Sequence, residues 1–278
     1  MELVDFIRNA LNEDVGDGDH TTLATVPEEL IGKARMIAKE EGILSGIEAG
    51  LEVFNQVDPE LKIEIFKKEG DKLTTGDIIL KVSGRVHSIL KSERLVLNIM
   101  QRMSGIATTT YKYTQAISDS KTKVLDTRKT TPNFRYFEKK AVLTGGGQNH
   151  RTGLYDMILI KDNHIDFAGG IKQAIEAANK YLSEKGKKLK IEIEARSLHD
   201  VEKIMEIGGV DRIMLDNFTP DQLKEAVNMI DGNFETEASG GITLENIRQY
   251  AEAGVDYISV GALTHSYKSL DISLKAEI

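Results

Sequence analysis

The stretch from Ile191 to Ile230 reads IEIEARSLHDVEKIMEIGGVDRIMLDNFTPDQLKEAVNMI. It contains two short apolar runs, IEIEA and RIMLD, and each is followed by a segment with apolar residues at helical spacing, LHDVEKIMEI and PDQLKEAVNMI. Strands that alternate with helices in this way predict βα units and therefore a parallel sheet.

The same pattern extends on both sides of this stretch. Further apolar runs are KVLD, MILIK, ETEAS and YISVG, and further helical segments are GGIKQAIEAANKYL and LENIRQYAEAG. The number of runs favours a closed or nearly closed βα barrel over an open sheet. In such barrels the chemistry lies at the C-terminal ends of the strands.

The N-terminal part has a different pattern and predicts a small α+β domain. After a predicted helix at 3–11 and an acidic loop, EDVGDGDHTT, alternating segments at 33–40, 62–66 and 78–84 predict antiparallel strands. A long helix over about 86–118 then leads to the barrel. We expect domains at 1–112 and 113–278, with the extreme C-terminus returning to the first domain.

Composition excludes several classes of protein. The 278 residues are 40% hydrophobic, carry a formal net charge of −8 and include no cysteine. The acidic charge disfavours general nucleic-acid binding, and without cysteine neither disulfides nor thiolate metal sites form. No run approaches the roughly 20 apolar residues of a membrane span. The N-terminal segment is not a signal peptide, and we expect a cytoplasmic protein.

Polar residues gather at the predicted strand ends and in the loop GGGQNHR. The candidate site residues are Thr127, Arg128, Lys129, His150, Arg151, Lys161, Glu194, Asp216, Ser239, Gly240, Gly241, Val260, Gly261 and Ala262. Arginine and lysine bind carboxylates and phosphates, and glycine turns allow backbone N–H groups to approach an anion. Together with two carboxylates, this set predicts a phosphorylated substrate and a divalent metal.

Each of these residues also has an ordinary structural interpretation. Arg128 and Lys129 could form a solvated basic turn, and the glycine turns could be simple tight turns. Lys161 ends a buried apolar run, so it could bind an anion, pair with Glu194 or form a covalent imine. Glu194 and Asp216 could share Mg²⁺, stabilise a developing positive charge or pair with basic residues.

A few further polar residues near these motifs receive a weaker assignment or none, and Asn246 is a secondary candidate. His164 could cap the following helix or act directly, His265 is a secondary candidate, and Arg196 has no assigned role.

The motifs resemble those of a known family. EDVGDGDHTT, ERLVLNIMQRMSGIAT, DTRKTTPNFR, AVLTGGGQNHRTGLYD, LIKDNH, IEIEA, IMLDN, ASGGI and GVDYISVGALTHS occur in this order. Together they resemble quinolinate phosphoribosyltransferase, and the resemblance covers nearly the whole chain. It implies an N-terminal α/β sandwich domain followed by an incomplete, TIM-like α/β barrel.

The resemblance also implies an activity. A pentosyltransferase of this family moves the phosphoribosyl group of PRPP to quinolinate and releases diphosphate and CO₂. The product is nicotinate mononucleotide, in de novo NAD synthesis. Mg²⁺ would accompany PRPP, no organic cofactor would be needed, and homodimers, which could assemble further, would share their active sites.

Residue roles follow from the same resemblance. Arg128, His150, Arg151 and Lys161 would face the quinolinate carboxylates, and Arg102 would reach into the neighbouring subunit's site. Lys129 and Lys161 would lie between the substrates, while Glu194 and Asp216 would hold the ribose hydroxyls and the metal. Ser239, Gly240, Gly241 and the turn Val260, Gly261 and Ala262 would bind the 5-phosphate.

Three alternatives stay open at this point. A paralogue of the same fold occurs with molybdate transport genes, and its activity is less clear. A barrel aldolase would use Lys161 as a Schiff-base nucleophile. A phosphate-ligand sensor would bind without catalysis.

Overall fold

The computed structural model describes residues 3–277, and the chain divides into two compact units. The first unit contains the chain up to Tyr111, the segment Thr131–Gly146 and the chain from Tyr267 onward. The second unit contains Lys112–Thr130 and Gly147–Ser266. The segment Thr131–Gly146, which the sequence pattern assigns to the barrel, therefore groups with the first unit.

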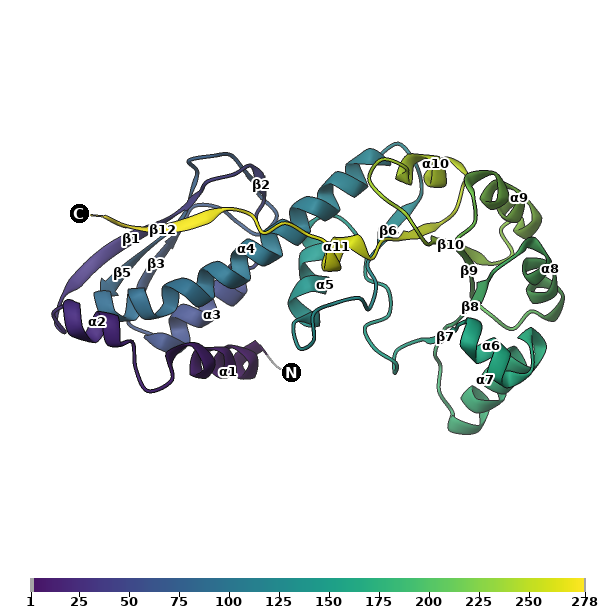
Figure 1. Ribbon diagram of the computed structural model, residues 1–278, viewed down its shortest axis with the longest axis horizontal. Helices are drawn as coiled ribbons and strands as arrows, with labels where there is room; N and C mark the ends of the chain where they lie inside the picture. Colours follow the sequence, from purple (N-terminus) through teal and green to yellow (C-terminus); the bar gives the residue numbers. More distant parts are fainter. Residues whose placement is uncertain (1–2, 278) are drawn as a thin grey trace. The chain divides into compact units, whose positions relative to one another are not determined.

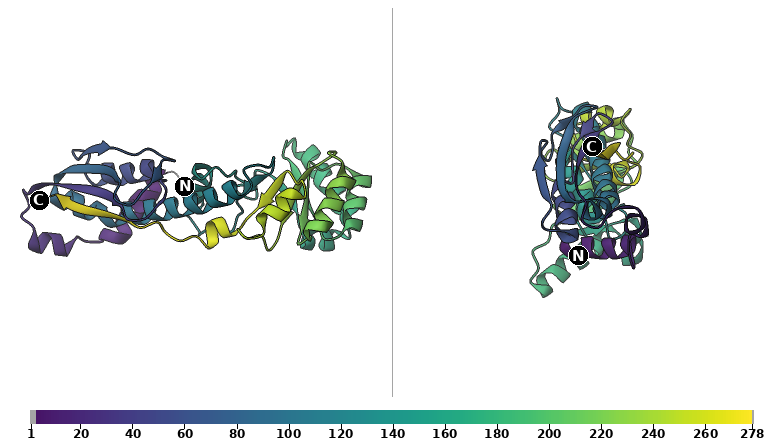
Figure 2. Two further views of the ribbon diagram at one scale, coloured as in Figure 1. Left: turned by 90° about the horizontal axis from the view of Figure 1, so that it is seen from above. Right: turned by 90° about the vertical axis from the view of Figure 1, so that its left-hand side faces the viewer.

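The first unit is built on an antiparallel sheet with the strand order β12-β1-β5-β3. Its strands are β1 (Ile31–Ala38), β3 (Lys62–Ile65), β5 (Ile78–Arg85) and β12 (Ile272–Glu277), and β2 (Gly42–Ile43) pairs separately with β4 (Lys72–Leu73). Its helices are α1 (Leu3–Val15), α2 (His20–Thr25), α3 (Ile47–Val57), α5 (Arg135–Thr144) and most of α4 (Val86–Ala116). Figures 1 and 2 show α3 and α4 along one face of the sheet.

One face of the long helix α4 forms part of the core of this unit. Val96, Met100 and Met103 recur at helical spacing on α4 and are buried. The C-terminal segment crosses the same helix at Gly105, where an added Cβ would lie 2.2 Å from the carbonyl oxygen of Lys268. Glycine therefore allows the last strand to return to the sheet beside β1.

The second unit is a parallel six-stranded sheet with the order β6-β11-β10-β9-β8-β7. Its strands are β6 (Lys123–Leu125), β7 (Ile158–Ile160), β8 (Ile191–Ala195), β9 (Arg212–Asp216), β10 (Glu235–Ser239) and β11 (Tyr257–Ser259). Among the described residues β6 does not pair with β7, so the barrel is open between them, which confirms the expected incomplete barrel.

Helices connect the strands of this unit. They are α6 (Asp162–Ala168), α7 (Ile171–Lys185), α8 (Leu198–Ile207), α9 (Pro220–Ile230), α10 (Ile247–Glu252) and α11 (Ala262–His265), and Figure 1 shows α7, α8 and α9 outside the strands. Ser197 caps α8 and Thr219 caps α9 through their hydroxyl oxygens, and Pro220 occupies the first position of α9. Across residues 3–277, none of the helices is long and apolar enough to cross a membrane.

Candidate active site

A cavity of about 890 Å³ lies in the second unit, where the parallel strands end. Its lining includes nearly all the predicted site residues of this unit: Thr127, Arg128, Lys129, His150, Arg151, Lys161, Glu194, Asp216, Ser239, Gly240, Gly241, Gly261 and Ala262. The structure therefore brings these separate motifs together. Val260 is the exception, since it is 1% exposed and belongs to the core.

The cationic wall of the cavity lacks internal counter-ions. Within the described part of the chain, Arg128, Lys129 and Lys161 form no ion pair with a carboxylate. The buried Nε of Arg128 has no hydrogen-bond partner there either. Because an unpaired buried donor is costly, this wall is built to receive an anion.

Arg151 adds a second guanidinium to the same wall. Burial lowers the pKa of Arg151, and the nearby charge of Arg128 lowers it further. Its Nη1 donates to the carbonyl oxygen of Met157 at 3.3 Å, and within residues 3–277 its other guanidinium nitrogens have no protein acceptor. Two arginines that repel each other favour a ligand with two negative charges.

His150 lines the cavity, but its ring nitrogens are both engaged with protein groups. The backbone N–H of Arg151 donates to Nδ1 at 2.7 Å, and Nε2 lies 2.9 Å from Oε2 of Glu192. The backbone N–H of His150 donates to the buried Asp126 at 2.9 Å. In this arrangement His150 fixes the loop that carries Arg151, and its ring proton faces the protein interior.

Beneath His150 lies a buried charge network on three neighbouring strands. Glu192 and Glu237 are fully buried, and Arg212 Nη1 donates to Glu237 at 2.9 Å. Burial raises the pKa of Glu192 to about 7 and that of Glu237 to about 8. Burial disfavours the ionised form of both carboxyl groups, and the nearby positive charges do not fully offset this effect.

The same network contains a group of side chains that could hold a metal ion. Ligand atoms of His150, Glu192 and Glu237 all lie within 4.8 Å of one another. Arg212 already supplies a positive charge to this group, so we interpret it as a charge network under the cavity and not as the metal site of the reaction.

Two carboxylates face the cavity from the ends of β8 and β9. Glu194 is half-buried, and its pKa is raised above the usual value. Burial is the main cause, and the charge of Asp216 adds to it. A hydrogen bond from the backbone N–H of Asp162 acts in the opposite direction. Lys161 lies close enough to lower the pKa of Glu194 but forms no ion pair with it. Two mutually repelling carboxylates suit a cation placed between them.

The turn after β10 is shaped by glycine. Gly240 has a φ of 97°, and an added Cβ would lie 2.2 Å from the side-chain oxygen of Asn217. Asn217 itself has a φ of 58°, a conformation that asparagine tolerates better than most residues. The Asn246 side chain donates to the carbonyl of Gly241 at 3.0 Å and accepts from the backbone N–H of Thr243 at 2.7 Å. The turn is therefore held in one shape.

Three of the weaker candidates have separate positions. His164 accepts a hydrogen bond from the backbone N–H of Lys161 at 2.9 Å, at the start of α6. His265 lines the cavity, and Arg196 pairs with Asp166 at 3.3 Å without lining it.

Sequence reasoning missed several residues of the lining. These are Leu159, Met214, Asn217, Glu237, Ile242, Thr243 and Ser259. Asn217 directly follows the predicted strand end, and Glu237 is a charged residue within a buried strand, so both carried a usable signal. The others are apolar or hydroxyl residues whose inward direction follows from the fold alone.

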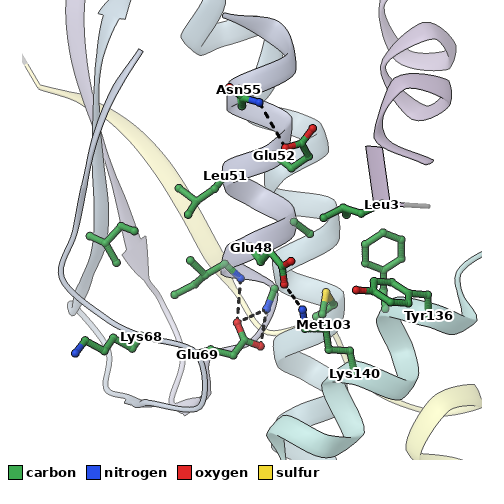
Figure 3. Close-up of a pocket in the computed structure, with 15 residues that line it drawn as sticks. Leu3, Glu48, Leu51, Glu52, Asn55, Lys68, Glu69, Met103, Tyr136 and Lys140 are labelled. Atoms are coloured by element: carbon green, nitrogen blue, oxygen red, sulfur yellow. Dashed lines mark hydrogen bonds and ion pairs between the residues drawn. The ribbon is translucent and has the colours of Figure 1, made fainter. Parts of the chain in front are cut away.

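Arg102 belongs to the first unit. Its guanidinium donates to Glu138 and to the hydroxyl of Thr131. The first unit also has a cavity of about 570 Å³, lined mainly by α3, with further residues from α5 and from the end of β3 and the segment after it (Figure 3). There Lys140 is paired with Glu48, and Glu69 accepts the backbone N–H groups at the start of α3. Among the described lining residues, Lys68 is then the one cation without an ion pair.

Comparisons with known proteins agree on one family. Residues 19–104 match the profile described as "Quinolinate phosphoribosyl transferase, N-terminal domain", and residues 106–275 match the corresponding C-terminal domain. "Nicotinate-nucleotide pyrophosphorylase [carboxylating], chloroplastic" from Arabidopsis thaliana is 46% identical over 98% of this chain and 82% of its own length.

Two bacterial proteins extend the match. The "Probable nicotinate-nucleotide pyrophosphorylase [carboxylating]" of Bacillus subtilis is 42% identical over 99% of this chain and 93% of its own. The crystal structure of nicotinate-nucleotide pyrophosphorylase from Ehrlichia chaffeensis superposes with a TM-score of 0.94. It is 37% identical and covers 100% of this chain and 99% of its own.

Proposed function

This chain belongs to the quinolinate phosphoribosyltransferase family, and on that premise we propose that it makes nicotinate mononucleotide from quinolinate and PRPP. The ring nitrogen of quinolinate attacks ribose C1, diphosphate leaves, and the 2-carboxylate departs as CO₂. This is a step of NAD synthesis.

The observation that carries the proposal is a set of cations that form no ion pair with a carboxylate among the described residues. Quinolinate has two adjacent carboxylates, and Arg128, Arg151 and Lys161 line one cavity with donors to spare. A guanidinium fork matches a carboxylate, so each arginine suits one carboxylate of the pair. Lys129 and Lys161 then lie at the junction with the anionic PRPP.

The opposite wall suits the ribose and its metal. Glu194 and Asp216 fit Mg²⁺ because their mutual repulsion is relieved by a cation and because carboxylate oxygens are its preferred ligands. Bound with PRPP, Mg²⁺ would stabilise the charge of the leaving diphosphate. The two carboxylates would also stabilise the oxocarbenium character that develops at C1.

The turns at Ser239–Gly241 and 260–262 suit the 5-phosphate. Gly240 and Gly241 both have positive φ values, 97° and 61°, and their backbone can approach an anion without a side chain in the way.

Decarboxylation places few demands on the protein. When the C2–carboxylate bond breaks, the electron pair stays on C2 beside the quaternised ring nitrogen, and C2 then takes a proton. The substrate thus supplies its own electron sink, so neither an organic cofactor nor an imine at Lys161 is part of the proposal. Arg128 and Arg151 hold the ring in place while water is displaced from the site.

Assembly and location complete the proposal. A homodimer, which could assemble further, would let Arg102 of one copy reach the cavity of the other. A cytoplasmic location is also proposed, whereas the Arabidopsis thaliana relative is named chloroplastic.

The test is an assay of the purified protein with quinolinate, PRPP and Mg²⁺. We expect equal amounts of nicotinate mononucleotide, diphosphate and CO₂. Absence of these products from folded protein would reject the proposal and favour the paralogue of molybdate transport loci. Turnover of nicotinate in place of quinolinate would show that the 2-carboxylate is not required. Borohydride trapping of a carbonyl substrate on Lys161 would favour the aldolase.

A further inference from the structure

Arg102 on α4 is held by several contacts. Its Nε donates to Oε1 of Glu138 at 3.1 Å, and its Nη2 donates to the same oxygen and to the Thr131 hydroxyl. Glu138 is fully buried, and its other oxygen accepts the backbone N–H of Thr131 at 3.2 Å. Glu138 is thus anchored through both oxygens.

Two aromatic rings enclose the same guanidinium. Its central carbon lies 4.9 Å from the ring centre of Phe134 and 4.7 Å from that of Tyr267. Phe134 stacks in turn on Phe137, with ring centres 4.7 Å apart, and contacts Phe6 at 5.5 Å. Because rings and guanidinium attract one another, the side chain has little freedom to rotate.

One edge of this fixed cation remains available. The Arg102 side chain is 23% exposed, and its Nη1 has no hydrogen-bond partner in the part of the chain that the structure describes. At the surface this nitrogen stays free to donate to a ligand, whereas burying it without an acceptor would be costly. Here the carboxylate is buried and the cation keeps a free donor.

We propose that Glu138, together with Phe134 and Tyr267, positions Arg102 so that its Nη1 edge binds a carboxylate of the aromatic dicarboxylate in a second copy of the chain. The inference rests on the proposed function and adds residues to it that do not touch the substrate. A side chain ordered before binding loses less freedom when it binds, so the clamp raises affinity for the dicarboxylate.

The test compares clamp variants with matched variants outside the clamp. E138Q removes the anchoring charge, and Y267L removes one ring. E48Q removes the carboxylate that pairs with Lys140, and Y136L removes the ring beside that lysine. The readouts are KM for quinolinate, KM for PRPP, kcat, melting temperature and binding of benzene-1,2-dicarboxylate by calorimetry.

We expect E138Q and Y267L to raise KM for quinolinate and Kd for benzene-1,2-dicarboxylate by about three- to tenfold, the loss expected from one freed side chain. KM for PRPP should stay within about twofold of the parent value, because the proposed contact of Arg102 is with quinolinate and not with PRPP. E48Q and Y136L should leave all these constants unchanged. If E138Q does not fold, Y267L decides the matter by the same constants.

Two outcomes would overturn the clamp. One is an unchanged KM for quinolinate in both clamp variants. The other is an equal rise in both KM values that follows a fall in melting temperature, because that pattern belongs to a structural ion pair. Failure of the proposed function looks different: in that case the parent protein itself would form no nicotinate mononucleotide from quinolinate and PRPP, and no variant would have a measurable KM for quinolinate.

Discussion

Arg128 is a partly buried cation in the barrel cavity whose own contacts leave one donor unsatisfied. Its buried Nε has no partner among the residues that the structure describes, and Arg151 lies near enough to feel its charge. A ligand carboxylate would satisfy both groups, whereas an ordinary surface arginine would be solvated. This contrast leads to the first prediction.

R128A should raise the KM for quinolinate by about 10- to 100-fold, the range for losing a charge-assisted hydrogen bond. R128K should recover little, because an ammonium lacks the planar fork. Steady-state kinetics with quinolinate as the varied substrate measure this effect. R196A is the control, since Arg196 pairs with Asp166 outside the cavity; an equal effect there would contradict the assignment.

Gly240 and Gly241 allow a second prediction at the scale of single residues. Both have a positive φ, but an added Cβ at Gly240 meets Asn217 at 2.2 Å, while Gly241 has nothing within 4 Å. G241A should therefore cost only the left-handed strain of about 1 kcal/mol, and G240A should cost clearly more. Denaturant unfolding of both variants measures the difference, and equal losses would refute it.

At the scale of elements, the strand register builds the charge network under the cavity. Glu192 lies opposite Arg212 in the β8–β9 pair, and Glu237 follows on β10. Alternate residues of these strands point inward, so three charged side chains meet in the barrel interior. Such charges interrupt the apolar runs expected of a buried parallel sheet, and they predict a pH effect.

Burial, with the charge of Glu192, raises the pKa of Glu237 from 4.5 to about 8. The folded state thus binds this proton more tightly than the unfolded chain, and stability falls as pH rises between these values. E237Q removes that group. The free energy of unfolding of E237Q, relative to that of the parent, should therefore rise between pH 4.5 and pH 8, by at most about 1.4 kcal/mol per pH unit. Denaturant unfolding at pH 5, 6.5 and 8 measures it.

Glu235 on the same strand supplies the control with the opposite sign. Burial raises the pKa of Glu235, but hydrogen bonds from Arg212 and Lys190 lower it more, so the net shift is downward. E235Q should therefore cost stability at neutral pH, and this loss should shrink as pH falls through the folded pKa. The same trend in both variants would contradict the network.

The element scale also explains how far the sequence could predict the site. Strand-end residues such as Arg128, Glu194 and Asp216 could be found because parallel strands end at one edge. The charges of Glu192 and Glu237 inside buried strands were visible in the sequence, but their partners were not, because whether such a charge is paired depends on its neighbours in the sheet. His150 was expected to face the ligand, but only the structure shows its ring held by Arg151 and Glu192.

At the scale of the whole molecule, the role proposed for Arg102 depends on how copies of the chain assemble. Its clamp lies entirely within the first unit, and the cavity lies entirely within the second. Family resemblance suggested that Arg102 acts on a neighbouring copy, and no pattern in the sequence alone pointed to it. Arg102 could act in the cavity of its own copy or in that of a neighbouring copy. These two arrangements predict different activities for mixed dimers.

R102A and K161A should each be nearly inactive alone, and mixing them separates the two arrangements. If Arg102 acts on the neighbouring copy, a mixed dimer has one cavity with both residues intact. Random exchange at equal amounts makes half the dimers mixed, so activity should recover to about a quarter of the parent value. If Arg102 acts within its own copy, every cavity lacks one residue and nothing is recovered. Activity after subunit exchange measures this, and R102A mixed with itself sets the baseline.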